Sequence, residues 1–169
     1  MKSLLRSTLI GANLLLFALS VHAAQPANAA DTPVLAIQTL DGKTFDLAHE
    51  RGKWVIVNFW ATWCSPCIAE MPAISRFVVS HKNVAAIGLA WDRSPREEIL
   101  KFARKHPVSY PLALVDMDHP PAGLEAPQVL PTTYLIAPDG HVAERIIAPV
   151  DEKSLARAIA AARPGSAGH

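Results

Sequence analysis

Cys64 and Cys67 are the residues of this sequence best suited to covalent chemistry. They are the only 2 cysteines among 169 residues, and two positions separate them. In thiol–disulfide exchange, one thiolate attacks a disulfide of another molecule and a second thiol resolves the mixed disulfide. The pair is therefore predicted to form a redox-active disulfide, with no further cofactor.

The cysteines lie where a strand is followed by a helix. Residues 54–60 (WVIVNFW) form a nearly continuous apolar run, typical of a strand buried on both faces. Pro66 is tolerated in a first helical turn, and an apolar periodicity continues to about Ser80. Unpaired N–H groups and the dipole at a helix N-terminus favour a thiolate, so the pKa of Cys64 should lie below about 8.5. Cys64 is the expected solvent-exposed nucleophile, and Cys67, one turn deeper, the resolving thiol.

Three other uses of the cysteine pair fit the sequence less well. A structural disulfide across so small a loop would constrain little of the unfolded chain. A zinc site needs two more ligands, but the 7 histidines are scattered and no second C-x-x-C is present. Two inert thiols would not be expected at a strand-to-helix junction behind Trp63. We therefore expect redox chemistry and no bound metal.

Strand and helix patterns alternate along the rest of the chain, separated by turn signals. The predicted elements are a hairpin with strands at 34–39 and 44–47, a strand at 84–90, a helix from its cap at Ser94 to about His106, a strand at 112–115, a loop at 116–129, a hairpin with strands at 133–137 and 142–148, and a helix at 151–162. This order predicts an α/β fold. The central sheet should be mixed, parallel where helices intervene and antiparallel at one edge, with helices on both faces.

The N-terminal segment has the pattern of a secretory signal peptide. Two basic residues precede an apolar stretch at 9–21, and small residues follow it. Cleavage after Ala23 or Ala29 would fit, and Ala29 is preferred because Pro26 breaks any helix just upstream. An uncleaved membrane anchor is the alternative, since the apolar run at 8–24 approaches the roughly 17 residues that can span a bilayer. Either outcome places the domain outside the cytoplasm, where disulfides persist.

The chain is predicted to contain a single domain. We assign residues 1–29 to the signal peptide, 30–163 to the domain and 164–169 to a disordered tail. Hydrophobic residues make up 50% of the sequence, enough for a core. The formal charge of +1 comes from 16 basic and 15 acidic residues and gives no electrostatic footprint for nucleic acid. We expect a periplasmic, or otherwise extracytoplasmic, monomer that does not bind nucleic acid.

Two motifs resemble those of the TlpA/ResA-like branch of exported thioredoxin-fold thiol–disulfide oxidoreductases, which includes the cytochrome c maturation reductases. They are VNFWATWCSPCIAEMP at 57–72 and VLPTTYLIAPDGHV at 129–142. The resemblance extends over about 31–163. It implies a thioredoxin fold with the N-terminal hairpin and with a helix–strand insertion at about 95–115.

The resemblance also implies a substrate-binding surface. In this family the proline of the L-P-T-T segment is cis and lies against the dithiol, which carries over to Pro131. A cis X-Pro bond bends the chain and removes an N–H, leaving neighbouring backbone groups free to pair with an extended substrate. The alternative is an ordinary proline at the start of a strand. The candidate substrate-binding residues are Trp63, Ser65, Pro66, Leu130, Pro131 and Thr132.

Glu70 is the third candidate catalytic residue, because ResA-like reductases carry an acidic residue near the dithiol at this position. It follows Cys67 by three residues, so both lie on one helix face. A partly buried carboxyl there could have a raised pKa and exchange a proton with Cys67. Asn58 replaces the buried Asp of cytoplasmic thioredoxins, and an amide cannot act as a base. The alternative for Glu70 is a solvent-facing glutamate without a role.

The function that the resemblance implies is disulfide reduction outside the cytoplasm. The reduced cysteine pair would donate two electrons to an exported client, such as an apocytochrome c, and a membrane thiol–disulfide carrier would restore them. Two alternatives remain open. The protein could instead donate disulfides, since dithiols of this fold span about −120 to −270 mV. It could also act as a copper or thiol metallochaperone with a soft two-sulfur site.

Overall fold

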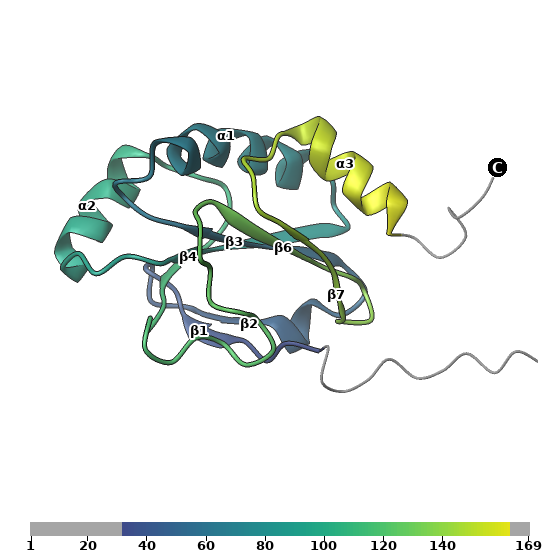
Figure 1. Cartoon of the computed structure of the whole chain (residues 1–169), viewed down its shortest axis with the longest axis horizontal. Coiled ribbons are helices and arrows are strands. Elements are labelled where there is room, and N and C mark those ends of the chain that lie inside the picture. Colours follow the sequence, from purple (N-terminus) through teal and green to yellow (C-terminus); the bar gives the residue numbers. More distant parts are fainter. Residues whose placement is uncertain (1–31, 163–169) are drawn as a thin grey trace, which may run out of the picture.

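A five-stranded mixed sheet forms the centre of the protein (Figure 1). The computed structural model describes residues 32–162, so the predicted signal peptide and C-terminal tail lie outside the described residues. The strand order is β5-β4-β3-β6-β7, with β3, β4 and β5 parallel and β6 and β7 antiparallel to their neighbours. The strands are β3 (Trp54–Trp60), β4 (Val84–Ala90), β5 (Leu112–Leu114), β6 (Thr132–Ile136) and β7 (Val142–Ile146).

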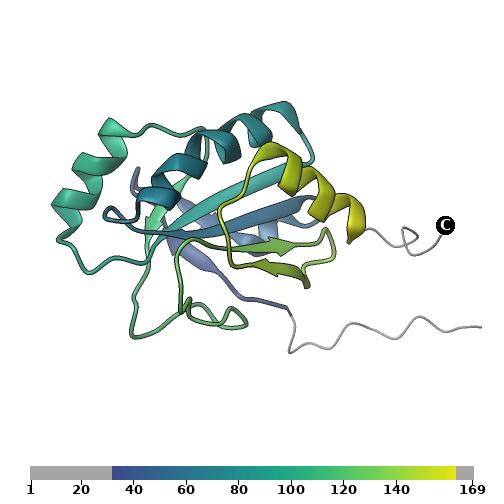
Figure 2. The same cartoon turned by 45° about the horizontal axis from the view of Figure 1, so that its top comes forward.

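The three α-helices within residues 32–162 pack on one face of the sheet, and Figures 1 and 2 show α1 and α3 side by side there. They are α1 (Ser65–Ser80), α2 (Arg96–Lys105) and α3 (Glu152–Ala161). The expectation of α-helices on both faces was wrong. Along the chain, β4 pairs next to β3 and β5 pairs next to β4, so the sheet grows toward the same edge at each step. Right-handed crossovers then put both linking helices on the same face.

The opposite face is covered by irregular and short elements. They are the antiparallel hairpin of β1 (Ala36–Gln38) and β2 (Thr44–Asp46), the 3-10 helix η2 (Leu47–Glu50) and the loop 116–131. The predicted hairpin and the helix–strand insertion are thus both present. None of the helices within residues 32–162 combines the length and apolarity needed to cross a membrane.

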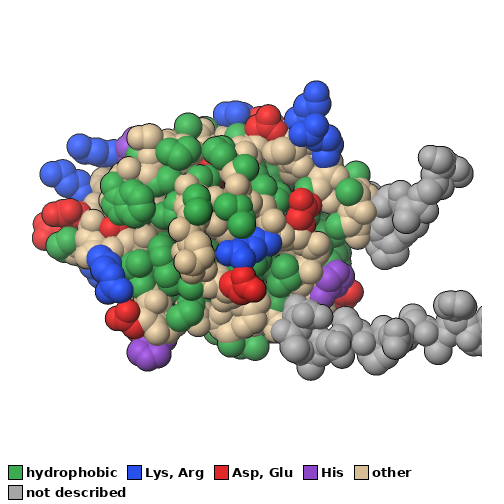
Figure 3. All heavy atoms as spheres, viewed as in Figure 1, with side chains coloured by type: hydrophobic (Ala, Val, Ile, Leu, Met, Phe, Trp, Pro, Cys, Tyr) green, Lys and Arg blue, Asp and Glu red, His purple; other side chains and the backbone are tan. Residues whose placement is uncertain are grey.

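The sheet is buried between two hydrophobic clusters, one on each face. Every residue of β3 is buried, as its uninterrupted apolar run predicted. Alternate residues of β3 serve opposite clusters, with Trp60 facing the helices and Phe59 facing the hairpin. Figure 3 shows acidic and basic side chains interspersed over the surface of this view, with no large patch of one sign. The buried central strand β3 thus ends shortly before the cysteine pair.

Candidate active site

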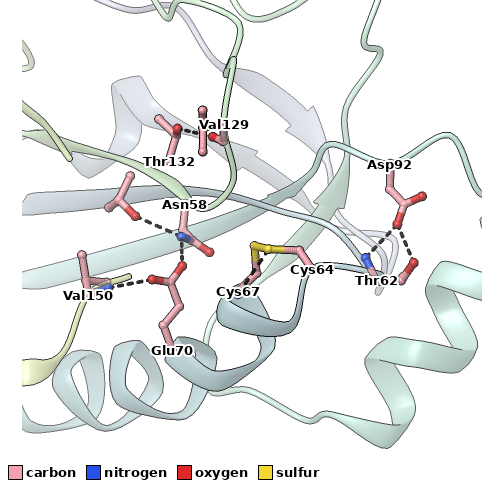
Figure 4. Close-up of a disulfide and its surroundings, with 10 residues drawn as sticks. Asn58, Thr62, Cys64, Cys67, Glu70, Asp92, Val129, Thr132 and Val150 are labelled. Atoms are coloured by element: carbon pink, nitrogen blue, oxygen red, sulfur yellow. Dashed lines mark hydrogen bonds between the residues drawn. A yellow bond between two sulfur atoms is a disulfide. The ribbon is translucent and has the colours of Figure 1, made fainter. Parts of the chain in front are cut away.

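Cys64 and Cys67 form a disulfide at the N-terminus of α1, directly after β3 (Figure 4). Cys64 is the N-cap residue, and its Sγ accepts a hydrogen bond from the Cys67 N–H at 3.3 Å. Pro66 occupies the first turn of the helix, where its missing N–H breaks no hydrogen bond. The structure thus places both sulfurs at the strand-to-helix junction that the sequence predicted.

The two sulfurs differ in burial less than expected. Cys67 is fully buried, as predicted for a resolving thiol, but Cys64 is only 5% exposed. Its sulfur is bonded to Cys67 and lies over the first turn of α1, which removes most of its contact with solvent. In the disulfide form, the residue expected to be the solvent-exposed nucleophile is therefore almost completely buried.

The candidate substrate-binding residues divide into exposed and interior groups. Trp63 is 68% exposed, and Ser65 and Pro66 are also exposed, so these three can meet a client directly. Leu130 is half-buried and is joined to the buried Pro131 by a cis peptide bond.

The side chain of Thr132 is fully buried, and its Oγ1 donates a hydrogen bond to the Val129 carbonyl at 2.6 Å. In the disulfide form Thr132 therefore presents neither its side chain nor its backbone to a client. Val129 itself was not predicted as a site residue, yet it is 58% exposed beside the L-P-T-T segment.

Glu70 is buried behind the disulfide and bridges three parts of the chain. Its Oε1 accepts a hydrogen bond from Asn58 Nδ2 at 2.7 Å, and its Oε2 accepts one from the Val150 N–H at 2.7 Å (Figure 4). Burial raises the pKa of Glu70 to about 7, and the hydrogen bonds from Val150 and Asn58 offset only part of that rise. The solvent-facing alternative is excluded, because Glu70 is only 3% exposed.

Asn58 is the central member of this buried polar group. It lies on β3, is fully buried, and also donates from Nδ2 to Thr133 Oγ1 on β6 at 3.0 Å. Within residues 32–162, the recorded partners of the Glu70 carboxyl are Asn58 and Val150 and include neither sulfur. The amide of Asn58 thus links the carboxyl group to the sheet.

Asp92 is a site residue that sequence reasoning missed. Its Oδ2 accepts hydrogen bonds from the N–H and Oγ1 of Thr62, at 2.8 and 2.6 Å, and its Oδ1 accepts one from the Ser94 N–H at 2.9 Å. Burial alone would raise the pKa of Asp92, but these hydrogen bonds outweigh it and lower the pKa. The contact fixes the loop between β3 and the cysteines.

A sequence signal for Asp92 did exist. Trp60 and Ala90 end neighbouring parallel strands in register, and Thr62 and Asp92 each follow by two residues. The carboxyl ends of parallel strands meet at one edge of a sheet. Asp92 also explains why Ser94 is not the helix cap that was predicted. The Ser94 N–H is bound to Asp92, and Pro95 is the N-cap of α2, without a side-chain hydrogen bond.

Within the part of the chain that the structure describes, no three His, Cys, Asp or Glu side chains gather so that they could hold a metal ion. The chemistry that this site offers is that of its sulfurs. A reversible disulfide at a helix N-terminus, set after the central strand of such a sheet, defines a thiol–disulfide oxidoreductase of thioredoxin-like fold.

Comparison with known proteins gives the same answer. The chain belongs to the AhpC/TSA family, whose family profile matches residues 27–145. It is 34% identical over 118 residues to a thiol-disulfide oxidoreductase ResA of Bacillus cereus, a match that covers 69% of this chain and 68% of that protein. The resemblance to ResA-like oxidoreductases predicted from the two motifs is therefore confirmed.

Two solved structures show the same fold. A thiol:disulfide interchange protein of the thioredoxin family from Chlorobium tepidum TLS superposes with a TM-score of 0.68 at 24% identity, covering 81% of this chain and 98% of that one. A secreted Mycobacterium tuberculosis disulfide oxidoreductase, homologous to E. coli DsbE, gives a TM-score of 0.60 at 25% identity, covering 75% and 95%. The predicted thioredoxin fold is confirmed.

Proposed function

We propose that this oxidoreductase works outside the cytoplasm as a reductase of disulfides in exported proteins, such as an apocytochrome c. A membrane thiol–disulfide carrier would return the protein to its dithiol form. Export is supported by the signal-peptide pattern of residues 1–29 and by the likeness to a secreted disulfide oxidoreductase. The reducing direction is supported by the resemblance of the two motifs to ResA-like reductases, and the position of Glu70 fits the proton transfer that this direction requires.

The proposed reaction has two exchange steps. The Cys64 thiolate attacks one sulfur of a client disulfide, and the other client sulfur leaves as a thiolate. Cys67 then loses its proton and attacks Cys64 Sγ, which releases the second client thiolate. The client gains two electrons, and the protein ends with the Cys64–Cys67 disulfide seen in the structure.

Glu70 fits the reducing direction, in which Cys67 acts as a nucleophile and must lose its proton. Cys67 is fully buried, so bulk water cannot readily remove its proton. The Glu70 carboxyl lies on the same helix, is buried, and has a pKa raised to about 7. A base with a pKa near the working pH is well matched to this proton transfer. Glu70 is accordingly proposed to accept the proton of Cys67.

The client would bind to the exposed surface next to the disulfide. Trp63 offers an apolar ring, and Ser65 and Pro66 continue the surface along the first turn of α1. Leu130 and Pro131 lead into β6, and Pro131 has no N–H to donate. An extended client segment could pair with the backbone next to Pro131 while its sulfur reaches Cys64.

The decisive measurement is the redox potential of the cysteine pair, together with insulin reduction in the presence of dithiothreitol. We expect a potential toward the reducing end of the range, near about −270 mV, and insulin reduction that Cys64→Ser abolishes. Cys67→Ser should retain a mixed disulfide with the client, visible as added mass. A potential near about −120 mV would instead identify a disulfide donor, and stoichiometric Cu(I) retained on gel filtration would identify a metallochaperone.

A further inference from the structure

The amide of Asn58 has one atom that the disulfide form leaves without a partner. Its Nδ2 donates to Glu70 Oε1 and Thr133 Oγ1, and the ionised carboxylate of Glu70 can only accept, which fixes the orientation of the amide in that form. Its Oδ1 is buried and makes no hydrogen bond with any of residues 32–162. A buried acceptor without a donor is costly, and such atoms often mark a functional requirement.

This oxygen points from β3 toward the disulfide, on the side of the amide away from Glu70 (Figure 4). Neither sulfur of a disulfide carries a hydrogen, so neither can donate to it. Reduction by a dithiol changes this, because the S–S bond breaks and two electrons and two protons enter. Each cysteine then carries an S–H donor, and that of Cys67 forms inside the protein, where water cannot compete for it.

We propose that Asn58 Oδ1 accepts a hydrogen bond from the Cys67 thiol in the reduced protein, which makes Asn58 a positioning residue for the resolving sulfur. One amide then holds both partners of the proposed proton transfer, Glu70 through Nδ2 and Cys67 through Oδ1. The assignment rests on the proposed function, since it concerns the dithiol form that attacks clients. The hydrogen bond exists only in that form and therefore stabilises the dithiol relative to the disulfide.

The S–H stretching band in the infrared tests the contact directly. In Cys64→Ser, Cys67 is the only thiol, and no other protein group absorbs in that region. We expect the band at lower wavenumber in the folded protein than in urea, and a return to the unbonded position when Asn58→Leu is added. The matched control is Thr133→Val, which removes the other acceptor of the same amide and should leave the band in place.

A redox equilibrium with glutathione gives an independent readout on the complete cysteine pair. Loss of a net hydrogen bond in Asn58→Leu should shift the equilibrium roughly three- to ten-fold toward the disulfide, whereas Thr133→Val should change it less than about two-fold. An unshifted equilibrium in a folded Asn58→Leu protein overturns the proposal.

If Asn58→Leu does not fold, the Cys64→Ser protein alone tests the proposal. An S–H band at the unbonded position would rule out the hydrogen bond from the Cys67 thiol to Asn58 Oδ1. The two proposals can also fail separately. An insulin-reducing protein with an unbonded Cys67 thiol refutes only the role of Asn58, whereas a bonded thiol in a protein that reduces no client refutes only the reductase function.

Discussion

Glu70 is a carboxyl group that the fold holds in its interior, and this makes its charge matter for stability. Its pKa rises from 4.5 to about 7 through burial. The nearby buried Tyr110 is the other titratable group coupled to it, and the negative charge of Glu70 adds to the burial that raises the pKa of Tyr110. The pKa of Glu70 is higher in the folded than in the unfolded protein. The contribution of its protonated form to the free energy of unfolding is therefore fully present below pH 4.5 and is lost as the pH rises through about 7.

The free energy of unfolding of the oxidised protein should therefore fall between about pH 4.5 and pH 8. A shift from 4.5 to about 7 corresponds to at most roughly 3 kcal/mol. Glu70→Gln, which has no charge to lose, should flatten this slope, as measured by urea unfolding at several pH values. Glu144→Gln is the control, because Glu144 is exposed and should leave the slope as it is. A slope unchanged in Glu70→Gln would show that Glu70 does not titrate in this range.

Catalysis should respond to Glu70 in the opposite sense. Glu70 must be ionised to accept the proton of Cys67, so the resolution rate should rise with pH through about 7. In Glu70→Gln this step should slow by about 10²-fold or more and lose that pH dependence. Rapid-quench measurement of client release from the mixed disulfide would follow it, and an unchanged rate would exclude Glu70 as the proton acceptor.

Single residues were predictable where a short-range rule applied. Helical periodicity placed Glu70 on the face of Cys67, and the two-residue spacing defined the cysteine pair. The partners of Glu70 were not predictable, because Val150 lies 80 positions away and only the packed fold brings its N–H to the carboxyl. The burial of Cys64 was not predicted. It depends on the position of the disulfide against the first turn of α1, where Cys64 Sγ accepts a hydrogen bond from the Cys67 N–H.

At the scale of elements, Asp92 joins the ends of β3 and β4 and so fixes the loop between β3 and the cysteines. Replacing it by Ala leaves the Thr62 and Ser94 N–H groups without an acceptor. Asp92→Ala should destabilise the protein by about 2 kcal/mol and slow insulin reduction, as measured by urea unfolding and turnover.

The matched control for Asp92 is Asp118→Ala. Asp118 forms an ion pair with Arg93 in which both side chains are about 70% exposed, so its loss should cost less than about 0.5 kcal/mol. Equal losses of stability in the two variants would show that the burial of Asp92 contributes nothing.

Elements defined by long apolar runs were predicted to the residue, as for β3 and β4. Their bounds follow from composition, because both faces of these strands are buried. The short strands of the first hairpin ended earlier than predicted, since their length depends on what packs against them. The expectation of helices on both faces failed for the α-helices, because the face of each helix depends on the order of strands in the sheet, and a linear pattern does not contain that order.

For the whole molecule, residues 32–162 contain both hydrophobic clusters and every strand of the two sheets described. A protein comprising residues 30–163 should therefore unfold in a single transition and reduce insulin as fast as the full chain. Coincident urea curves by tryptophan fluorescence and circular dichroism would verify this. Non-coincident curves, or lost activity, would show that the predicted domain bounds are too narrow.

The contact between Glu70 and Val150 also has a consequence for biosynthesis. A chain is made from its N-terminus, so both thiols emerge well before the backbone N–H that holds Glu70. At about 5–20 residues per second, the 80 positions from Glu70 to Val150 take roughly 4–16 s to synthesise. Glu70 gains its Val150 partner only after that interval, so the polar group behind the disulfide is completed by one of the later parts of the chain to be made.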